Sequence, residues 1–404
     1  MSTPFRRVLG NRQFRWFLAS WTTGSTGYSV YAISIVWLTY QATHSFLIVG
    51  AVLAVERGAY CLTFLVAPIA DRVRNQRTIF LASYPAQAVA AVVLAVGAET
   101  HTLSVAELLG LVALLSILWD VSWAAANAAP GILLPPDDQF AVAGVEGLLG
   151  GANSIAGYAA GGVLILVVGA GGGMFLYAGL LVAATALSLP LQIHPPGGRE
   201  GSFLDSFRSG WTTMTAGRGR PLLQLAAVDA VQGLFSAAPV LVLALVAVRA
   251  FHGSAFDYAA LFVAYVLGGV LAGLGFARWN PRGRVGALVA GSLAATAAAF
   301  AAVAGVPAIV AVGAAVWFSV GFAQAAYLDA KYAFLRGSVP AGQLGRVTSN
   351  LYVFPGVSST IGIAVLGAIA VTVSTPELAV VVAAGFLASA VLATALPGVR
   401  RLRY

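Results

Sequence analysis

Residues 194–220, HPPGGREGSFLDSFRSGWTTMTAGRGR, form the longest polar stretch of this chain of 404 residues. On either side of it, long apolar runs alternate with short polar gaps. Apolar residues make up 59% of the chain and charged residues 9%, and the mean hydropathy is +0.89. Water cannot solvate such a composition as one compact domain. The sequence therefore predicts an integral membrane protein that the polar stretch divides into two halves.

Twelve apolar runs reach the length of about 20 residues that a helix needs to cross a hydrocarbon core about 30 Å thick. They cover approximately residues 15–41, 46–69, 78–97, 104–127, 141–168, 173–193, 221–248, 257–278, 285–304, 306–334, 347–374 and 377–396. The first run is too long for the core of a signal peptide, so we read it as a retained span. We predict an all-α integral membrane fold with twelve transmembrane helices.

Six runs lie on each side of the polar stretch, which predicts an N-terminal six-helix bundle at 1–193, a cytoplasmic linker at 194–220 and a C-terminal six-helix bundle at 221–404. The halves also resemble each other weakly at an offset of about 205 residues, as parallel transporter repeats do. This duplication favours two pseudo-symmetric bundles. Residues 202–214 fit either an amphipathic helix on the membrane surface or a flexible tether.

Basic residues gather in the polar gaps on one side of the predicted spans. They are Arg6, Arg7, Arg12, Arg15, Arg72, Arg74, Arg77, Arg199, Arg208, Arg218, Arg220, Arg278, Arg282, Arg284, Arg336, Arg346, Arg400, Arg401 and Arg403. Arg249 is the basic residue of the opposite side. The positive-inside rule therefore predicts a multi-pass protein of the cell membrane with both termini in the cytoplasm. The net charge of +8 reports this topology, and no nucleic-acid partner is expected.

The gap between the second and third runs reads APIADRVRNQR, residues 67–77. It resembles the GxxxDRxGRR signature of the major facilitator superfamily at Asp71, Arg72 and Arg77, and departs from it at Ala67 and Arg74. The resemblance extends over nearly the whole chain and implies the twelve-helix fold of that superfamily. There this loop latches the cytoplasmic helix ends, with its aspartate facing a helix N-terminus, where the helix dipole favours a carboxylate. A solvated loop that follows the positive-inside rule is the alternative.

The fifth run carries small residues in a second pattern. It resembles the glycine-rich motif of drug antiporters in that superfamily, with matches at Gly144, Gly157, Gly161 and Gly162 and departures at Asn153 and Tyr158. The runs NRQFRWFLASW, LPPDDQ and FRSGW further resemble exporters related to those of macrolides and siderophores. These resemblances imply efflux. Ordinary close packing of helices through small residues is the alternative.

Ionisable residues within the apolar runs are the main evidence about function. Each costs roughly 2.5–3.5 kcal/mol at the bilayer centre on insertion scales, so such residues usually face a protein interior or a water-filled cavity. They are Glu56, Arg57, Asp120, Asp229, Asp329 and Lys331. In the superfamily that the chain resembles, helices one, four, seven and ten mainly line the central cavity. We therefore treat all six residues as candidates for proton coupling or for lining the cavity.

Glu56 lies near the middle of its run and is our leading candidate for the proton carrier, because burial lets a carboxyl group alternate between protonated and ionised forms. Arg57 points about 100° away from it around the helix. Asp120 is our first guess for the partner of Arg57. A purely structural buried pair is the alternative.

The remaining three candidates have less specific interpretations. Asp229 fits either a cavity carboxylate or a residue at a helix start. Lys331 either faces the cavity or extends its ammonium group to the membrane interface. Asp329 lies near the repeat-related position of Asp120, which favours a symmetric pair of gate groups.

Together these observations predict a secondary transporter that exports small, mostly apolar organic compounds in exchange for protons by alternating access. We expect a monomer whose partners are a small-molecule substrate, protons and the lipid bilayer, and we expect no cofactor, metal or catalytic residue. The alternatives are a major facilitator importer or facilitator for a metabolite, and a non-transporting receptor or scaffold. An enzyme is the remaining class, because His252 and Asp257 have an HxxxxD spacing that resembles acyltransferases. No nucleophile motif supports that interpretation.

Overall fold

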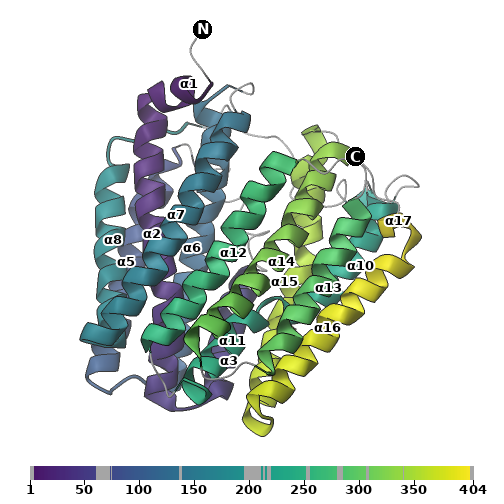
Figure 1. Cartoon of the computed structure of the whole chain (residues 1–404). Coiled ribbons are helices and arrows are strands. Elements are labelled where there is room, and N and C mark those ends of the chain that lie inside the picture. The colour runs from purple at the N-terminus through teal and green to yellow at the C-terminus, as the bar shows by residue number, and fades with distance from the viewer. Residues whose placement is uncertain are drawn as a thin grey trace. The chain divides into compact units, whose positions relative to one another are not determined.

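The computed structural model describes residues 4–60, 73, 75–135, 139–194, 211–212, 214–215, 220–251, 255–279, 285–305, 309–339 and 341–400. These residues are predominantly helical (Figure 1), which confirms the predicted all-α class. The helices are α1 (Pro4–Gly10), α2 (Arg12–Thr43), α3 (Phe46–Tyr60), α5 (Arg77–Glu99), α6 (Val105–Leu133), α7 (Gln139–Val168), α8 (Ala170–Ser188), α10 (Arg220–Ser236), α11 (Ala238–Arg249), α12 (Ala255–Trp279), α13 (Val285–Val303), α14 (Val310–Ser338), α15 (Ala341–Thr372), α16 (Thr375–Ala395) and α17 (Pro397–Arg400).

The described part of the chain contains ten helices that are long and apolar enough to cross a membrane, so this is a multi-pass membrane protein. Helix α2 is not among the ten although it has 32 residues. Serine, threonine and tyrosine side chains along the helix lower its hydropathy. The predicted second span, 46–69, is described as far as Tyr60.

The predicted seventh span, 221–248, matches the membrane-crossing stretch Pro221–Arg249, which contains one break. Helix α10 ends at Ser236 and α11 begins at Ala238. Pro239 has no backbone N–H and its ring would clash with the carbonyl group four residues earlier, so a continuous helix is interrupted just before it. Proline is well suited to the first turn of the helix that follows, where its missing N–H would have no partner anyway.

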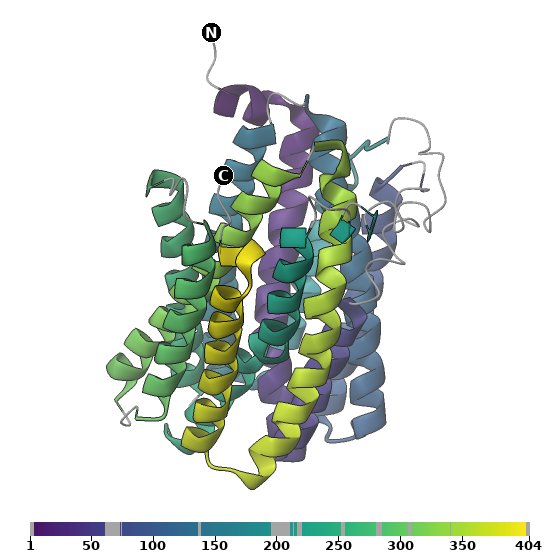
Figure 2. The same ribbon diagram turned by 90° about the vertical axis from the view of Figure 1, so that its right-hand side faces the viewer.

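Contacts divide the chain into two compact units, each of which forms its own helical bundle. The first unit comprises Met1–His44 and Leu62–Glu200, and the second comprises Ser45–Cys61 and Gly201–Tyr404. In the first unit α2 packs on α7 and α8, while α5 packs on α6 and α8. In the second unit α12 packs on α14, α13 packs on α14 and α16, and α10 runs beside α15 (Figure 2).

Helix α3 joins the second unit because it packs along α15. The repeat-based division predicted from the sequence places the same helix in the N-terminal bundle at 1–193. Contacts and repeats are different criteria, and the division into bundles at 1–193 and 221–404 stays a prediction.

Glycine residues hold neighbouring helices close together within each unit. On α7, a Cβ atom added at Gly157 would lie 2.5 Å from the Cβ of Ser29 and 2.6 Å from the carbonyl oxygen of Thr26, both on α2. In the second unit, a Cβ at Gly50 of α3 would lie 2.7 Å from the Cα of Gly367 on α15. Neither contact leaves room for a side chain, and small residues are what allow membrane helices to approach so closely.

We expect Gly157→Ala to lower the free energy of unfolding by about 1–3 kcal/mol, the usual cost of overpacking. Gly150→Ala on the same helix is the matched control, because a Cβ there meets no atom within 4 Å. Alanine is favoured over glycine in a helix interior by roughly 0.5–1 kcal/mol, so the control should be neutral or stabilising. Thermal unfolding of both variants in one detergent measures the difference. Equal midpoints would contradict the close contact between α7 and α2.

Candidate functional site

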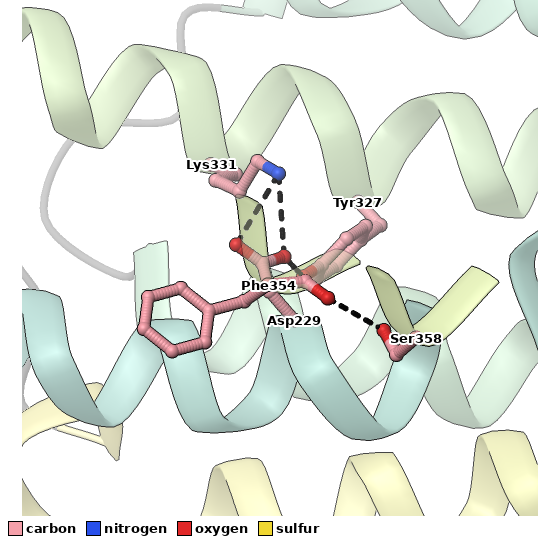
Figure 3. A network of polar contacts seen from close by, with 5 residues as sticks. All are labelled: Asp229, Tyr327, Lys331, Phe354 and Ser358. Atoms are coloured by element: carbon pink, nitrogen blue, oxygen red, sulfur yellow. Dashed lines mark hydrogen bonds and ion pairs between the residues drawn. The ribbon is translucent and has the colours of Figure 1, made fainter. Parts of the chain in front are cut away.

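Three polar side chains meet inside the second unit. Asp229 lies on α10, whereas Tyr327 and Lys331 lie four residues apart on α14 and therefore share one face of that helix. Figure 3 shows the three side chains turned toward one another, with Phe354 and Ser358 of α15 beside them. The site thus connects α10, the first part of the membrane-crossing stretch Pro221–Arg249, to the membrane-crossing helix α14.

The centre of the site is a buried ion pair. The Nζ atom of Lys331 lies 3.2 Å from Oδ1 and 3.4 Å from Oδ2 of Asp229, and the hydroxyl group of Tyr327 donates a hydrogen bond to Oδ1. Asp229 is 0% exposed and Lys331 is 5% exposed. Lys331 Nζ also lies 5.7 Å and 5.4 Å from the ring centroids of Tyr327 and Tyr332, where the ring faces attract a cation. Lys331 is therefore enclosed by protein side chains, and whether it faces the cavity stays a prediction.

Helix α15 packs against α10 next to the site. Gly233, one turn after Asp229 on α10, faces Pro355, and a Cβ there would lie 2.8 Å from the Cα of Pro355 and overlap the hydroxyl group of Ser358. The Oγ atom of Ser358 donates a hydrogen bond of 2.8 Å to the carbonyl oxygen of Phe354 (Figure 3). Helix α10 is thus fixed against α15, which determines where Asp229 meets α14.

The electrostatics of the site make its two charges dependent on each other. Removing an ion from water costs several kcal/mol even after relaxation, and attraction between two buried ions offsets this cost only when the geometry is good and the remaining hydrogen-bonding groups are satisfied. Tyr327 satisfies part of that requirement by donating to Asp229. The protein interior therefore tolerates each of these charges while the other is present.

The other ionisable candidates of the second unit lie on different helix faces. Glu56 is half-buried and Arg57 is exposed, both on α3. Asp329 is half-buried on α14, and its Oδ2 atom lies 3.8 Å from the Cβ position of Gly273 on α12. Because Asp329 and Lys331 are two residues apart on a helix, they point to nearly opposite sides of α14. Of the six predicted candidates, the structure brings Asp229 and Lys331 together.

Asp120 is the predicted candidate of the first unit, where it lies on α6 with 5% of its surface exposed. Arg57 belongs to the second unit, so the pairing of these two residues stays a prediction. No group of three or more His, Cys, Asp or Glu residues that could hold a metal ion occurs in the part of the chain that the structure describes.

The glycine motif of the fifth span lies on α7. Gly157 and Gly161 both face α2, and a Cβ at Gly161 would lie 2.6 Å from Cγ2 of Ile33. Gly162 is buried, and Gly144 lies in the first half of the same helix. At least two residues of the motif therefore have the packing role that the sequence left open. Its bearing on transport direction stays a prediction.

The predicted cytoplasmic motif is described in part. Asp71 and Arg72 lie outside the described residues, as does His252 of the enzyme hypothesis. Arg77 is half-buried and is the first residue of α5. The backbone N–H of the residue before it, Gln76, donates a hydrogen bond of 2.8 Å to the carbonyl oxygen of Ile193. The end of the motif is thus tied to the segment that follows α8 in the same unit.

Tyr327, which donates the hydrogen bond to Asp229, is not among the residues predicted from the sequence. A signal was available, because a tyrosine one turn before a lysine on one helix shares its face. The pairing of Lys331 with Asp229 had no such signal. One sequence gives the positions along each helix but not which helices are neighbours.

No family model and no characterised protein sequence matches the chain. The POT family transporter PepTSo is similar in structure, with a TM-score of 0.76 and 13% identity over 96% of this chain and 97% of that one. The nucleoside transporter NupG gives 0.71 and 11% over 95% and 98%, and the human organic anion transporter MFSD10 gives 0.66 and 17% over 97% and 100%. These are transporters and not enzymes, and the likeness confirms the predicted transporter fold of twelve transmembrane helices.

We expect Asp229→Asn and Lys331→Met each to lower the free energy of unfolding by about 3–5 kcal/mol, because each leaves one buried charge without its partner. The double variant should lose clearly less than the sum of the two losses, since it removes both charges. Arg7→Met, which removes an exposed charge, is the control. Thermal unfolding in one detergent supplies the four values of the cycle. Additive losses would show that the two charges do not depend on each other.

Proposed function

We propose that this protein is a secondary transporter that exports small, mostly apolar organic compounds in exchange for protons. The observation that carries the proposal is the ion pair of Asp229 and Lys331, which lies buried in membrane-crossing helices. Ionisable residues at such depth are costly, and they commonly mark pathways for substrates or ions. The fold, shared with solved transporters, supports the same class of function.

Glu56 is the proposed proton carrier. Glu56 is half-buried, and a partly buried carboxyl group suits a proton that is exchanged between two states of the protein. Asp229 is less suited to that role, because loss of its negative charge would leave the ammonium group of Lys331 buried beside a neutral side chain. In this proposal the ion pair connects α10 to α14 while Glu56 exchanges the proton.

The proposed direction is export. It rests on the resemblance of the fifth span to drug antiporters, in which Gly157 and Gly161 lie against α2. The arginine-rich gaps place both termini in the cytoplasm by the positive-inside rule, so the substrate would be taken up from the cytoplasmic side of the cell membrane. We propose a monomer as the transporting unit.

Import of a metabolite is the second candidate function. Solved structures that resemble this chain include a nucleoside transporter and a POT family transporter in complex with 5-aminolevulinic acid. A nucleoside and 5-aminolevulinic acid are both small and polar. The direction of proton-driven movement separates import from export, because the gradient drives substrate inward in one case and outward in the other.

The test of the proposed function is accumulation of a panel of dyes and antibiotics in pump-deficient cells that express the protein, with and without a protonophore. We expect lower accumulation of some compounds, and we expect the protonophore to abolish the difference. Glu56→Gln should reduce the effect at least tenfold at normal expression, because it removes the exchangeable proton. Glu99→Gln makes the same change at the exposed end of α5 and should leave export intact.

Unchanged proton-dependent export in Glu56→Gln would exclude Glu56 as the carrier. Raised accumulation of a compound in cells with an intact gradient would favour the importer. No change for any compound, with membrane insertion demonstrated, would favour the receptor or scaffold.

A further inference from the structure

The first unit contains a stack of three aromatic rings that the proposed function does not yet use. Trp21 and Tyr28 lie seven residues apart on α2, which is about 10 Å along the helix axis. The ring centroid of Trp119 on α6 lies 5.3 Å from that of Trp21 and 4.1 Å from that of Tyr28, with interplanar angles of 21° and 10°. Trp119 therefore lies between the other two rings. We call these three residues the α2–α6 stack.

The side of α2 that carries the stack is only partly covered. No residue from 16 to 40 is exposed, and the half-buried ones gather in the first half of the helix. A half-buried stripe with the spacing of one helix face comprises Trp21, Ser25, Tyr28 and Ala32. The rings of the stack are themselves half-buried. Part of each ring therefore remains accessible.

This stripe differs in chemistry from the surfaces of the protein that suit lipid. On α5, Val89 is 65% exposed and Val93 is 47% exposed, and on α16, Leu387 and Val391 are 53% and 58% exposed. Those surfaces are aliphatic and widely open, as contact with acyl chains requires. The stripe on α2 bears aromatic and hydroxyl groups and is narrowly open, which suits a surface that meets water or a ligand.

Hydroxyl groups beside the stack add hydrogen-bond acceptors. Thr22 donates to the carbonyl oxygen of Ala19 at 3.1 Å, and Thr26 donates to that of Thr22 at 2.9 Å. Each hydroxyl proton is thus engaged within α2, while the oxygen can still accept a hydrogen bond. A ligand at the stack would therefore meet ring faces and edges together with a few acceptor oxygens.

We infer that the α2–α6 stack binds the planar aromatic portion of the exported compound. This inference rests on the proposed function, because it names the substrate class of the same transporter. Flat ring systems gain most from contact with other rings in offset or edge-on geometry. Ring faces also attract cations. The expected substrates are planar aromatic compounds, with cations preferred over anions.

The test is equilibrium binding of ethidium, a planar aromatic cation, to the purified full-length protein in detergent without a proton gradient. Competition by tetrapentylammonium, a cation without aromatic rings, provides the comparison. We expect Trp119→Leu to weaken ethidium binding about tenfold and to leave tetrapentylammonium binding within about twofold. Trp119→Phe keeps a ring and should recover most of the ethidium affinity.

Trp16→Leu is the matched control, because it removes a half-buried tryptophan of α2 that lies outside the stack. It should leave the affinities for both cations unchanged. If Trp119→Leu does not fold, Tyr28→Leu replaces it, because Tyr28 stacks directly on Trp119. Its affinities for ethidium and tetrapentylammonium are then compared in the same way. Unchanged ethidium affinity, or equal loss for both cations, would overturn the inference.

The outcome is separable from that of the proposed function. Ethidium binding that depends on the stack, without proton-driven export, would support the binding site and exclude the proposed coupling of export to protons. In the alternative outcome, cells show proton-driven export while Trp119→Leu leaves ethidium binding unchanged. That result would exclude the stack as the binding site and would still support the proposed transporter.

Discussion

Contact between helix backbones at glycine is the interaction on which the rest of this structure depends. Burial of apolar surface gives membrane helices no net drive to associate, because lipid is as apolar as their side chains. Association relies on van der Waals contact and hydrogen bonds, which act over short distances. Gly157 brings α7 onto α2, and Gly50 with Gly367 brings α3 onto α15. A single Cβ atom at such a contact would separate the helices and every polar group placed between them.

Polar groups are also paired between neighbouring helices within each unit. The interhelical pairs include Ser20 with Ser188 at 2.7 Å, Ser83 with Ser122 at 2.6 Å, Tyr177 with Gln87 at 2.8 Å and Tyr265 with Gln324 at 2.8 Å. Hydrocarbon cannot supply a hydrogen-bond partner, so a buried polar side chain must find one within the protein. The ion pair of Asp229 and Lys331 is the charged case of the same rule. Its members depend on the contact between Gly233 and Pro355, which positions α10.

Much of the fold could be predicted from the sequence, because a helix that crosses a bilayer leaves a local signal of length and hydropathy. The predicted span at 285–304 matches α13, Val285–Val303, and the span at 78–97 matches α5, Arg77–Glu99. The break before Pro239 was not predicted. A proline alone does not decide whether a helix ends, since Pro355 lies inside α15 without ending it. Neighbouring helices decide whether a proline ends a span or bends it.

The site was less predictable for a different reason. All six ionisable candidates can be located in the sequence as charged residues within apolar runs. The pairing of Asp229 with Lys331 depends on which helices are neighbours. That information is long-range and leaves no trace in one sequence. The aromatic residues of α2 are likewise visible in the sequence, but nothing in it shows which rings meet. Only the position of Trp119 on α6 reveals that these rings form a stack.

The two candidate sites imply different kinds of selectivity. A site built from buried hydrogen-bonding groups rejects a compound that leaves one of them unpaired, and this penalty makes it narrow. A stack of rings offers faces that any flat ring system can meet, so it tolerates chemical variety. The charges of Asp229 and Lys331 neutralise each other, so this pair does not require a charged group on the substrate. With recognition at the rings of Trp21, Tyr28 and Trp119, the protein would accept many planar compounds and discriminate mainly by shape.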